Sequence, residues 1–235
     1  MSEKTSTVDT AGVRLGPEDI SLVVDGARPL TPESVAAVTA VCDTAEDRAG
    51  RGRVVLQVGG VPDSTWTGEL TVSLVSKWER ALRRLERLPA TTIALADGDC
   101  GGTALDAMLA ADYRIATASV RLVVPVGDGA TWPGMALYRL AQHGASAAAI
   151  RRAVLFGTPV EATDALALHL VDELTEDVAG ALATVARRAG AVSGTELALR
   201  RQLMADAATT SFEEALGVHL AAVDRTLRRA AGAAS

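Results

Sequence analysis

The sequence has few aromatic residues and almost no cysteine. Aromatic side chains make up 3% of the 235 residues, so alanine, valine and leucine must fill most of the core. The two cysteines, Cys42 and Cys100, are too few for a disulfide framework and form no CxxC pair. The three histidines lack the spacing of metal ligands, so we expect no metal site.

Runs of positive charge and long apolar runs are also missing. With a net charge of −6 and no prominent run of Lys or Arg, the chain does not show the clustered cations that phosphate binding needs, so nucleic acid is not an expected partner. The first twelve residues are polar and contain no apolar signal core. No apolar run reaches the roughly 18 residues that span a bilayer. We therefore expect a cytoplasmic protein without a membrane partner.

Short β-branched runs alternate with helical patterns over the first half of the chain. "ISLVVDG" (20–26), "RVVLQVGG" (53–60) and "TTIALADG" (91–98) predict buried strands that end in glycine, and "YRIAT" (113–117) predicts a fourth. Strands separated by helices favour a parallel sheet with crossover helices. The fold class expected is therefore α/β, with 53–60 and 91–98 as neighbouring strands.

Two helices are predicted between these strands. Thr31 is a suitable N-cap, followed by Pro32 at the first helical position. In the second helix, five apolar residues recur at spacings of three and four and so share one face. These residues are Leu70, Leu74, Trp78, Leu82 and Leu85.

The chain is expected to divide into three parts. Residues 1–19 form a flexible N-terminus, 20–174 the α/β core and 175–235 a C-terminal helical region. The pattern turns helical after about residue 134. Ser211 and Glu214 form a capping box at the start of the last amphipathic helix.

The stretch "GDCGGTALD", from Gly98 to Asp106, predicts a loop that opens into a helix. The first N–H groups of a helix lack backbone partners and carry the positive end of its dipole, and glycine lets a ligand approach them. This terminus suits a phosphate or a carbonyl oxygen that becomes anionic. The glycine spacing fits neither a P-loop nor a dinucleotide fingerprint.

Asp106 lies one turn into that helix. Helical side chains lean toward the N-terminus, and the residue four positions back is Gly102, so we expect the carboxylate beside the free N–H groups. Two interpretations stay open at this point. Asp106 is either a reactive carboxylate or an early-turn acid that only complements the helix dipole.

"GDCGG" also resembles the nucleophile loop of chymotrypsin-fold cysteine proteases, with Cys100 as nucleophile. That fold places the histidine base before the nucleophile. Here His143, His169 and His219 all follow it, and the surrounding pattern is α/β. Cys100 is more simply a small loop residue, and His169 and His219 are residues of helical segments.

Residues 93–117 resemble the central motif of the crotonase family, the enoyl-CoA hydratases and isomerases. "WPGMALYRL" (132–140), "LFGTPVEATDALALHLVDEL" (155–174) and "WTGEL" (66–70) resemble further motifs of the family in the same order. The resemblance implies the crotonase spiral fold, a homotrimer or hexamer, and an acyl-CoA substrate. It implies no cofactor apart from the coenzyme A of that substrate.

Within the family, two stretches are similar to one branch. "SKWERALRRLERLPA" (76–90) and "GDCGG…ALDA" (98–107) resemble the hydratase-type component of the 3,5-dihydroxyphenylglycine pathway. In that pathway, crotonase-fold proteins assist a type III polyketide synthase in forming 3,5-dihydroxyphenylacetyl-CoA by loss of water. The expected partners are therefore such a synthase or a second crotonase-fold protein.

The resemblance also implies roles for individual residues. The backbone N–H groups of Gly68 and Thr103 match the oxyanion hole that stabilises the enolate-like thioester. Asp106 matches the first catalytic glutamate. The second falls on Val126, which cannot transfer a proton, and Asp128 lies two residues further on as a candidate replacement.

The substrate is expected to lie against Gly101, Gly102, Val126, Pro133 and Gly134. Two hypotheses follow. The chain is a dehydratase-type lyase that works with Asp106, alone or with Asp128. Alternatively, it is a catalytically weak crotonase-fold subunit that binds an acyl-CoA or a partner enzyme.

Overall fold

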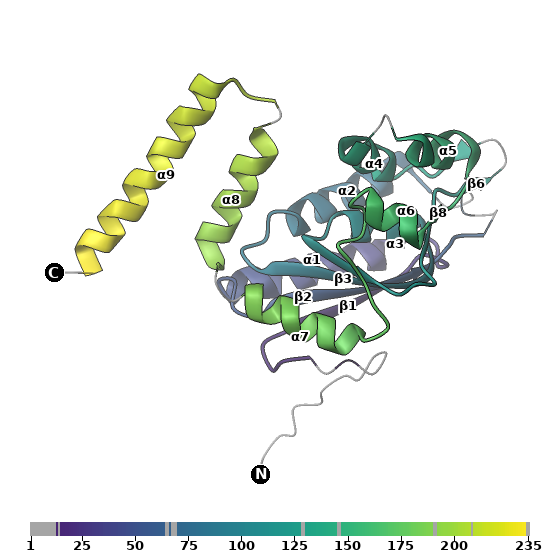
Figure 1. Cartoon of the computed structure of the whole chain (residues 1–235), viewed down its shortest axis with the longest axis horizontal. Helices are drawn as coiled ribbons and strands as arrows, with labels where there is room; N and C mark the ends of the chain where they lie inside the picture. Colours follow the sequence, from purple (N-terminus) through teal and green to yellow (C-terminus); the bar gives the residue numbers. More distant parts are fainter. Residues whose placement is uncertain are drawn as a thin grey trace, which may run out of the picture.

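The structure is a computed structural model, and it shows an α/β core followed by helices (Figure 1). It describes residue 13 and residues 15–63, 66, 70–127, 130–144, 147–189, 192–207 and 209–233. Among these residues, no helix is long and apolar enough to cross a membrane.

The core is built on a sheet whose central strands run parallel in the order β1-β2-β3-β4-β9. β5 pairs with β3 in parallel and with β8 antiparallel, while β6 and β7 form a separate small hairpin. The strands are β1 (Ile20–Asp25), β2 (Arg53–Gly60), β3 (Thr91–Gly101), β4 (Tyr113–Ala116), β5 (Arg121–Val123), β6 (Val126–Gly127), β7 (Ala130–Thr131), β8 (Val160–Glu161) and β9 (Glu173–Leu174). The predicted α/β class is confirmed, and β2 and β3 are neighbouring parallel strands as expected.

Helices cover both faces of this sheet. They are α1 (Pro32–Asp47), α2 (Val72–Leu85), α3 (Gly102–Leu109), α4 (Ala136–Gly144), α5 (Ala148–Phe156), α6 (Ala162–Ala167), α7 (Val178–Ala189), α8 (Gly194–Asp206) and α9 (Phe212–Ala233). The larger apolar cluster joins α1 to α6 with one face of the sheet. The smaller cluster packs α7 on the other face, against residues such as Val55 and Ile93 (Figure 1).

The helix signals in the sequence match the caps that are observed. At the start of α1, Thr31 Oγ1 accepts a hydrogen bond of 3.3 Å from the Ser34 N–H, and Pro32 is the first helical residue. In α2, Trp78, Leu82 and Leu85 are buried and Leu74 packs partly buried against the core, which confirms the predicted apolar face for these residues. Leu70 was expected on the same helix face but lies before the helix, because α2 begins at Val72 after the N-cap Thr71. Burial of this face, rather than intrinsic propensity, supplies most of the stability of such a helix.

The strand β3 is longer than predicted. It continues through Gly101, so the residues expected to form a loop are paired with β5. Asp99 forms a two-bond ion pair with Arg121 of β5, at 2.6 Å for each contact. Cys100 is consequently a buried strand residue, not the loop residue that was expected.

The C-terminal helices α8 and α9 lie beside the α/β body rather than on it (Figure 1). No residue of α8 is buried. Arg201 of α8 donates to the backbone oxygens of Leu88 and Ala90 and so anchors this helix at the start of β3. The predicted capping box of α9 is confirmed, since the Ser211 N–H donates to Glu214 Oε2 at 3.1 Å.

The two described histidine side chains have different surroundings. His219 is an exposed residue of α9, as predicted. His169 is not helical. It follows the end of α6 in a turn, with a left-handed φ of 55°.

Candidate functional site

The carboxyl ends of β1, β2 and β3 meet in glycines. A Cβ on Gly26 would collide with the backbone oxygens of Gly60 and Gly101 and would lie 3.0 Å from the Cβ of Ala104. Only glycine therefore allows the ends of the three strands to approach one another this closely. In open α/β sheets, ligands bind outside the carboxyl ends of the strands, which is the edge defined here.

Helix α3 begins at this edge. Its N-cap is Gly101, which has no side chain to accept a bond from the first-turn N–H groups. Gly102 has a left-handed φ of 55°, and a Cβ there would lie 2.9 Å from the ring of Pro62. Thr103 follows with a buried side chain and an N–H in the first turn. This terminus combines the positive end of the helix dipole with a Thr103 N–H that no side chain caps.

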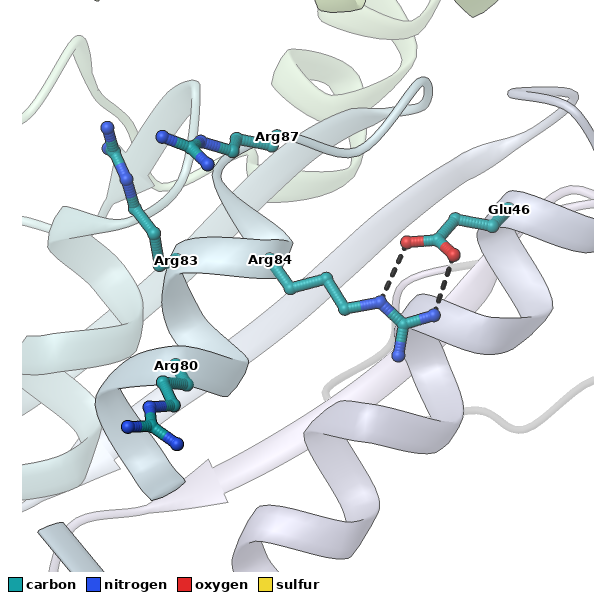
Figure 2. A pocket seen from close by; sticks show the side chains of 5 residues that line it. All are labelled: Glu46, Arg80, Arg83, Arg84 and Arg87. Carbon is teal, nitrogen blue, oxygen red and sulfur yellow. Dashed lines mark hydrogen bonds and ion pairs between the residues drawn. The ribbon is translucent and has the colours of Figure 1, made fainter. Parts of the chain in front are cut away.

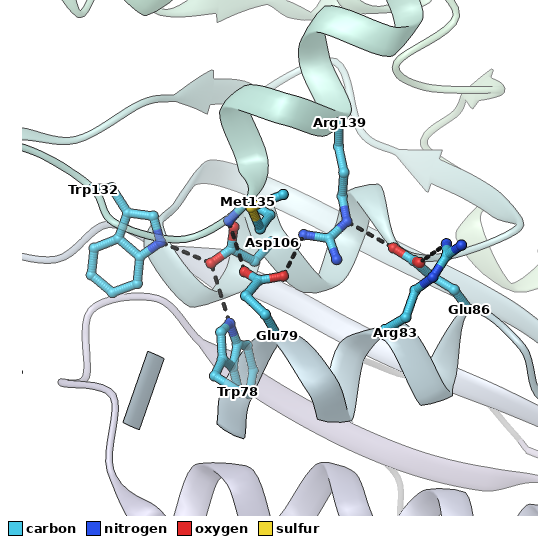
Figure 3. Close-up of polar contacts among 8 residues, drawn as sticks. All are labelled: Trp78, Glu79, Arg83, Glu86, Asp106, Trp132, Met135 and Arg139. Atoms are coloured by element: carbon cyan, nitrogen blue, oxygen red, sulfur yellow. Dashed lines mark hydrogen bonds and ion pairs between the residues drawn. The ribbon is translucent and has the colours of Figure 1, made fainter. Parts of the chain in front are cut away.

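Asp106 lies one turn further along α3 and is completely buried. Its Oδ2 accepts hydrogen bonds from the indole N–H of Trp132 at 2.8 Å and from that of Trp78 at 3.2 Å. Figure 3 shows the two indole rings pointing toward the carboxylate from different elements. The carboxylate is thus held by tryptophans, whereas the sequence analysis expected it beside the free N–H groups at the start of the helix.

The pKa of Asp106 is raised to about 7, mainly by burial and also by the nearby charge of Glu79. The hydrogen bond from Trp132, the charge of Arg139 and the hydrogen bond from Trp78 act in the opposite direction. Within the described part of the chain, Oδ1 of Asp106 has no hydrogen-bond partner. A buried carboxyl with a raised pKa and an unpartnered oxygen has the features that suit general acid–base chemistry.

The carboxylate is covered by the segment that links β7 to α4. The ring of Trp132 is buried and packs edge-on against Trp66, with centroids 5.4 Å apart. A Cβ on Gly134 would collide with Oδ2 of Asp106 and would lie 2.6 Å from Oδ1. The predicted substrate-binding residue Gly134 thus lies directly against Asp106.

An ion-pair network fixes this cover to α2 (Figure 3). The Met135 N–H donates to Glu79 Oε1 at 2.7 Å, and Arg139 donates to Glu79 Oε2 at 3.0 Å. Arg139 also donates to Glu86 Oε1 at 2.8 Å. Because Arg139 is buried, these bonds are shielded from water and hold the start of α4 firmly.

The sequence analysis did not predict this network. Trp78 was identified only as an apolar residue of a helix face. Nothing in the sequence marked Glu79, Trp132 and Arg139 as neighbours of Asp106. The sequence patterns of α2 and α4 do not reveal that the polar side chains of these two helices meet.

The remaining predicted residues occupy different positions. Val126 is 56% exposed in β6, and Pro133 is exposed beside Trp132. Gly101 and Gly102 are buried at the start of α3. Gly68 and Asp128 lie outside the described residues, so their predicted roles stay predictions.

Cys100 does not have the surroundings of a nucleophile. Its thiol is buried, lies 3.8 Å from the sulfur of Met108, and has its pKa raised by burial and by the charge of Asp106. A thiolate is therefore strongly disfavoured at this position. The parallel sheet also excludes the double β-barrel of the chymotrypsin-fold proteases.

A cluster of arginines lies toward the C-terminal end of α2 (Figure 2). Arg80, Arg83, Arg84 and Arg87 line a pocket of about 290 Å³ together with Glu46, which accepts two bonds from Arg84 at 2.8 and 2.6 Å. Cations near a helix C-terminus complement its dipole by about 0.3–1 kcal/mol each. The cluster is explained by this effect and by its ion pair, and we assign it no role at the site.

Among the described residues, no group of acidic, histidine and cysteine side chains could hold a metal ion.

The comparisons with known proteins agree with this α/β architecture. The chain is 58% identical over 214 residues to a protein of Amycolatopsis orientalis named enoyl-CoA-hydratase, an alignment that covers 91% of this chain and 98% of the relative. The chain therefore belongs to the enoyl-CoA hydratase/crotonase superfamily. No family model matches the sequence.

Solved structures support the same fold. The enoyl-CoA hydratase of Mycobacterium smegmatis superimposes with a TM-score of 0.77 at 17% identity, over 89% of this chain and 87% of that one. An enoyl-CoA hydratase/isomerase of Marinobacter aquaeolei gives the same TM-score at 14% identity, over 90% and 88% of the two chains. The predicted crotonase fold is confirmed.

Proposed function

We propose that this protein is an enoyl-CoA hydratase/dehydratase-type lyase that acts on an acyl-CoA thioester. One observation carries the proposal: a buried carboxyl, Asp106, lies one turn after the uncapped helix terminus that presents the Thr103 N–H. The relative of 58% identity, which bears the name of such an enzyme, supports it. In this proposal the N–H groups of Thr103 and Gly68 hold the thioester oxygen.

A single carboxyl can serve both proton transfers of a dehydration. As a base, Asp106 removes the proton from the carbon next to the thioester, and the electron pair moves onto the thioester oxygen as an enolate. The enolate then reforms the carbonyl and expels the β-hydroxyl, which takes the same proton from Asp106 and leaves as water. A pKa of about 7 suits both steps at neutral pH.

The closed cover sets a condition on this mechanism. Asp106 has no exposed surface, and Trp132 and Gly134 lie over its carboxylate. A thioester can reach the carboxyl only when the Pro133–Met135 part of this cover moves aside, while Trp132 keeps its bond to Oδ2. The ion pairs of Arg139 with Glu79 and Glu86 resist that movement.

For the acyl group, we propose the 3,5-dihydroxyphenylacetyl-CoA branch of secondary metabolism. Residues 76–90 and 98–107 support this branch through their resemblance to its hydratase-type component. The proposed partners are a type III polyketide synthase or a second crotonase-fold protein of the same pathway.

The second candidate function is a catalytically weak accessory subunit of that synthase. Two observations favour it: the complete burial of Asp106, and an exposed Val126 where a second acid is expected. An inert side chain at this position leaves only one of the two expected carboxyls. The accessory subunit would bind an acyl-CoA or the synthase and alter its product.

Turnover measurements separate the two functions. Purified protein is mixed with an enoyl-CoA, and the loss of the conjugated thioester absorbance is followed, first alone and then beside the synthase. The lyase hypothesis expects hydration by the protein alone. Hydration that never occurs alone, together with a changed product of the synthase, supports the accessory subunit.

We also propose a homotrimer or a dimer of trimers. Helix α9 presents Leu216, Leu220 and Val223 on one face, with exposed fractions of 41%, 54% and 37%. Spacings of four and three residues place them in one stripe. A stripe of this kind is normally covered by another surface, and a symmetric copy of the chain is the simplest partner.

A further inference from the structure

We propose that Trp132 is a positioning residue that confines the transferable proton of Asp106 to a single oxygen, Oδ1. The inference rests on the proposed function, in which Asp106 is the acid and base. It adds an assignment of the reacting atom and of the residue that selects it.

The assignment follows from the chemistry of the indole ring. An indole N–H is a donor and offers no lone pair to a proton. Both indoles, Trp132 at 2.8 Å and Trp78 at 3.2 Å, donate to the same oxygen, Oδ2. A proton on Oδ2 would face these two N–H groups, so the protonated carboxyl carries its proton on Oδ1.

The other polar groups around Asp106 do not compete for Oδ1. Glu79 of α2 is engaged by the Met135 N–H and by Arg139 of α4. The Cys100 thiol of β3 contacts the sulfur of Met108. Oδ1 itself has no hydrogen-bond partner among the residues that the structure describes, although it is buried. It is therefore the oxygen left free to receive a proton from a substrate and to return it.

Trp132 contributes more to this arrangement than Trp78 because its bond is shorter. Its N–H stabilises the charged form of the carboxyl and keeps Oδ2 occupied. Without it, the carboxyl holds its proton to higher pH, and Oδ2 becomes available to that proton.

The test uses Trp132→Phe, which removes the N–H and keeps an aromatic ring. We expect kcat to fall at nearly constant KM, and the pH midpoint of turnover to rise by about one pH unit. Trp78→Phe should move the midpoint in the same direction by less. Trp66→Phe is the matched control, because Trp66 packs against Trp132 and donates no bond to Asp106 in the described structure. The pH midpoint of turnover of this variant should equal that of the parent.

Nuclear magnetic resonance tests the arrangement without any substrate. The indole N–H resonances of Trp78 and Trp132 should shift together with pH near neutrality, and Asp106→Asn should abolish both shifts. If this titration is seen but no acyl-CoA is turned over, the proposed function fails and the hydrogen-bond arrangement stands. An indole resonance of Trp132 that ignores Asp106, or a pH midpoint unchanged in a folded Trp132→Phe variant, overturns the inference.

Discussion

Gly134 lies against the carboxylate of Asp106, so closely that a Cβ at residue 134 would be 2.6 Å from Oδ1 and nearer still to Oδ2. Gly134→Ala should therefore displace the carboxylate or lift the cover. Overpacking of this kind typically costs about 1–3 kcal/mol of unfolding free energy. We expect this loss in chemical denaturation, together with a changed pH midpoint of turnover.

The matched control is Gly217→Ala. Gly217 lies in α9, and a Cβ there meets nothing within 4 Å. The control should leave activity unchanged and should not destabilise the protein, because alanine favours helix over glycine. If Gly134→Ala behaved like the control, the cover would not be packed on Asp106.

Asp106→Asn should lower turnover by about 10²–10⁴-fold at nearly constant affinity for the CoA ester. Asparagine keeps the size of the side chain and an oxygen for the indoles but cannot accept the proton from the substrate. Asp128→Asn, measured beside it, tests whether that residue replaces the missing second acid. Should both variants match the parent on the true substrate, the lyase hypothesis would fail in favour of the accessory subunit.

Val126→Glu should increase hydration of a simple enoyl-CoA. The position is 56% exposed, so a glutamate is tolerated, and it restores a carboxyl where the family resemblance places one. A well-placed acid is worth up to about 10²–10⁴-fold, and a newly introduced one should reach the lower part of that range. Val126→Gln is the control of equal size. Equal rates for Glu and Gln would show that Val126 is not what limits turnover.

The parallel core could be predicted because the stretches 53–60 and 91–98, which lie in β2 and β3, are short β-branched runs that end in glycine and flank an amphipathic helix. The C-terminal end of β3 could not be predicted from the sequence. Asp99 and Gly101 are unfavourable in strands by propensity, yet pairing with β5 and the ion pair to Arg121 extend the strand over them.

The site was predictable only in part. The sequence indicated the glycine-lined helix terminus and Asp106, because both belong to one local stretch. The partners of Asp106 come from α2 and from the segment before α4, and they lie 28 and 26 residues away along the chain. Contacts of this kind depend on how the elements pack, and an apolar pattern around Trp78 does not reveal the direction of its N–H.

Leu220→Glu should weaken assembly. Leu220 is 54% exposed within the stripe of α9, and covering a leucine is worth about 1.5–3 kcal/mol. Sedimentation should therefore show a smaller species for the variant at micromolar concentration. His219→Glu adds a carboxylate one residue away and should leave the assembly intact. A parent protein that sediments as a stable monomer would contradict the proposed trimer.

The raised pKa of Asp106 predicts how stability depends on pH. In the unfolded chain the carboxyl titrates near pH 4, and in the folded protein burial moves its pKa to about 7. Between these values the folded state binds the proton that the unfolded state has lost, so folding becomes less favourable as the pH rises from 4 to 7. Asp106→Asn removes this contribution, because asparagine stays neutral. The stability of the variant relative to the parent should therefore increase over this range, by up to about 4 kcal/mol, and stay level above it.

Denaturant titrations of both proteins at pH 5, 6, 7 and 8 measure the difference. A difference that does not change with pH would mean that Asp106 is ionised throughout, and the acid–base assignment would lose its physical basis.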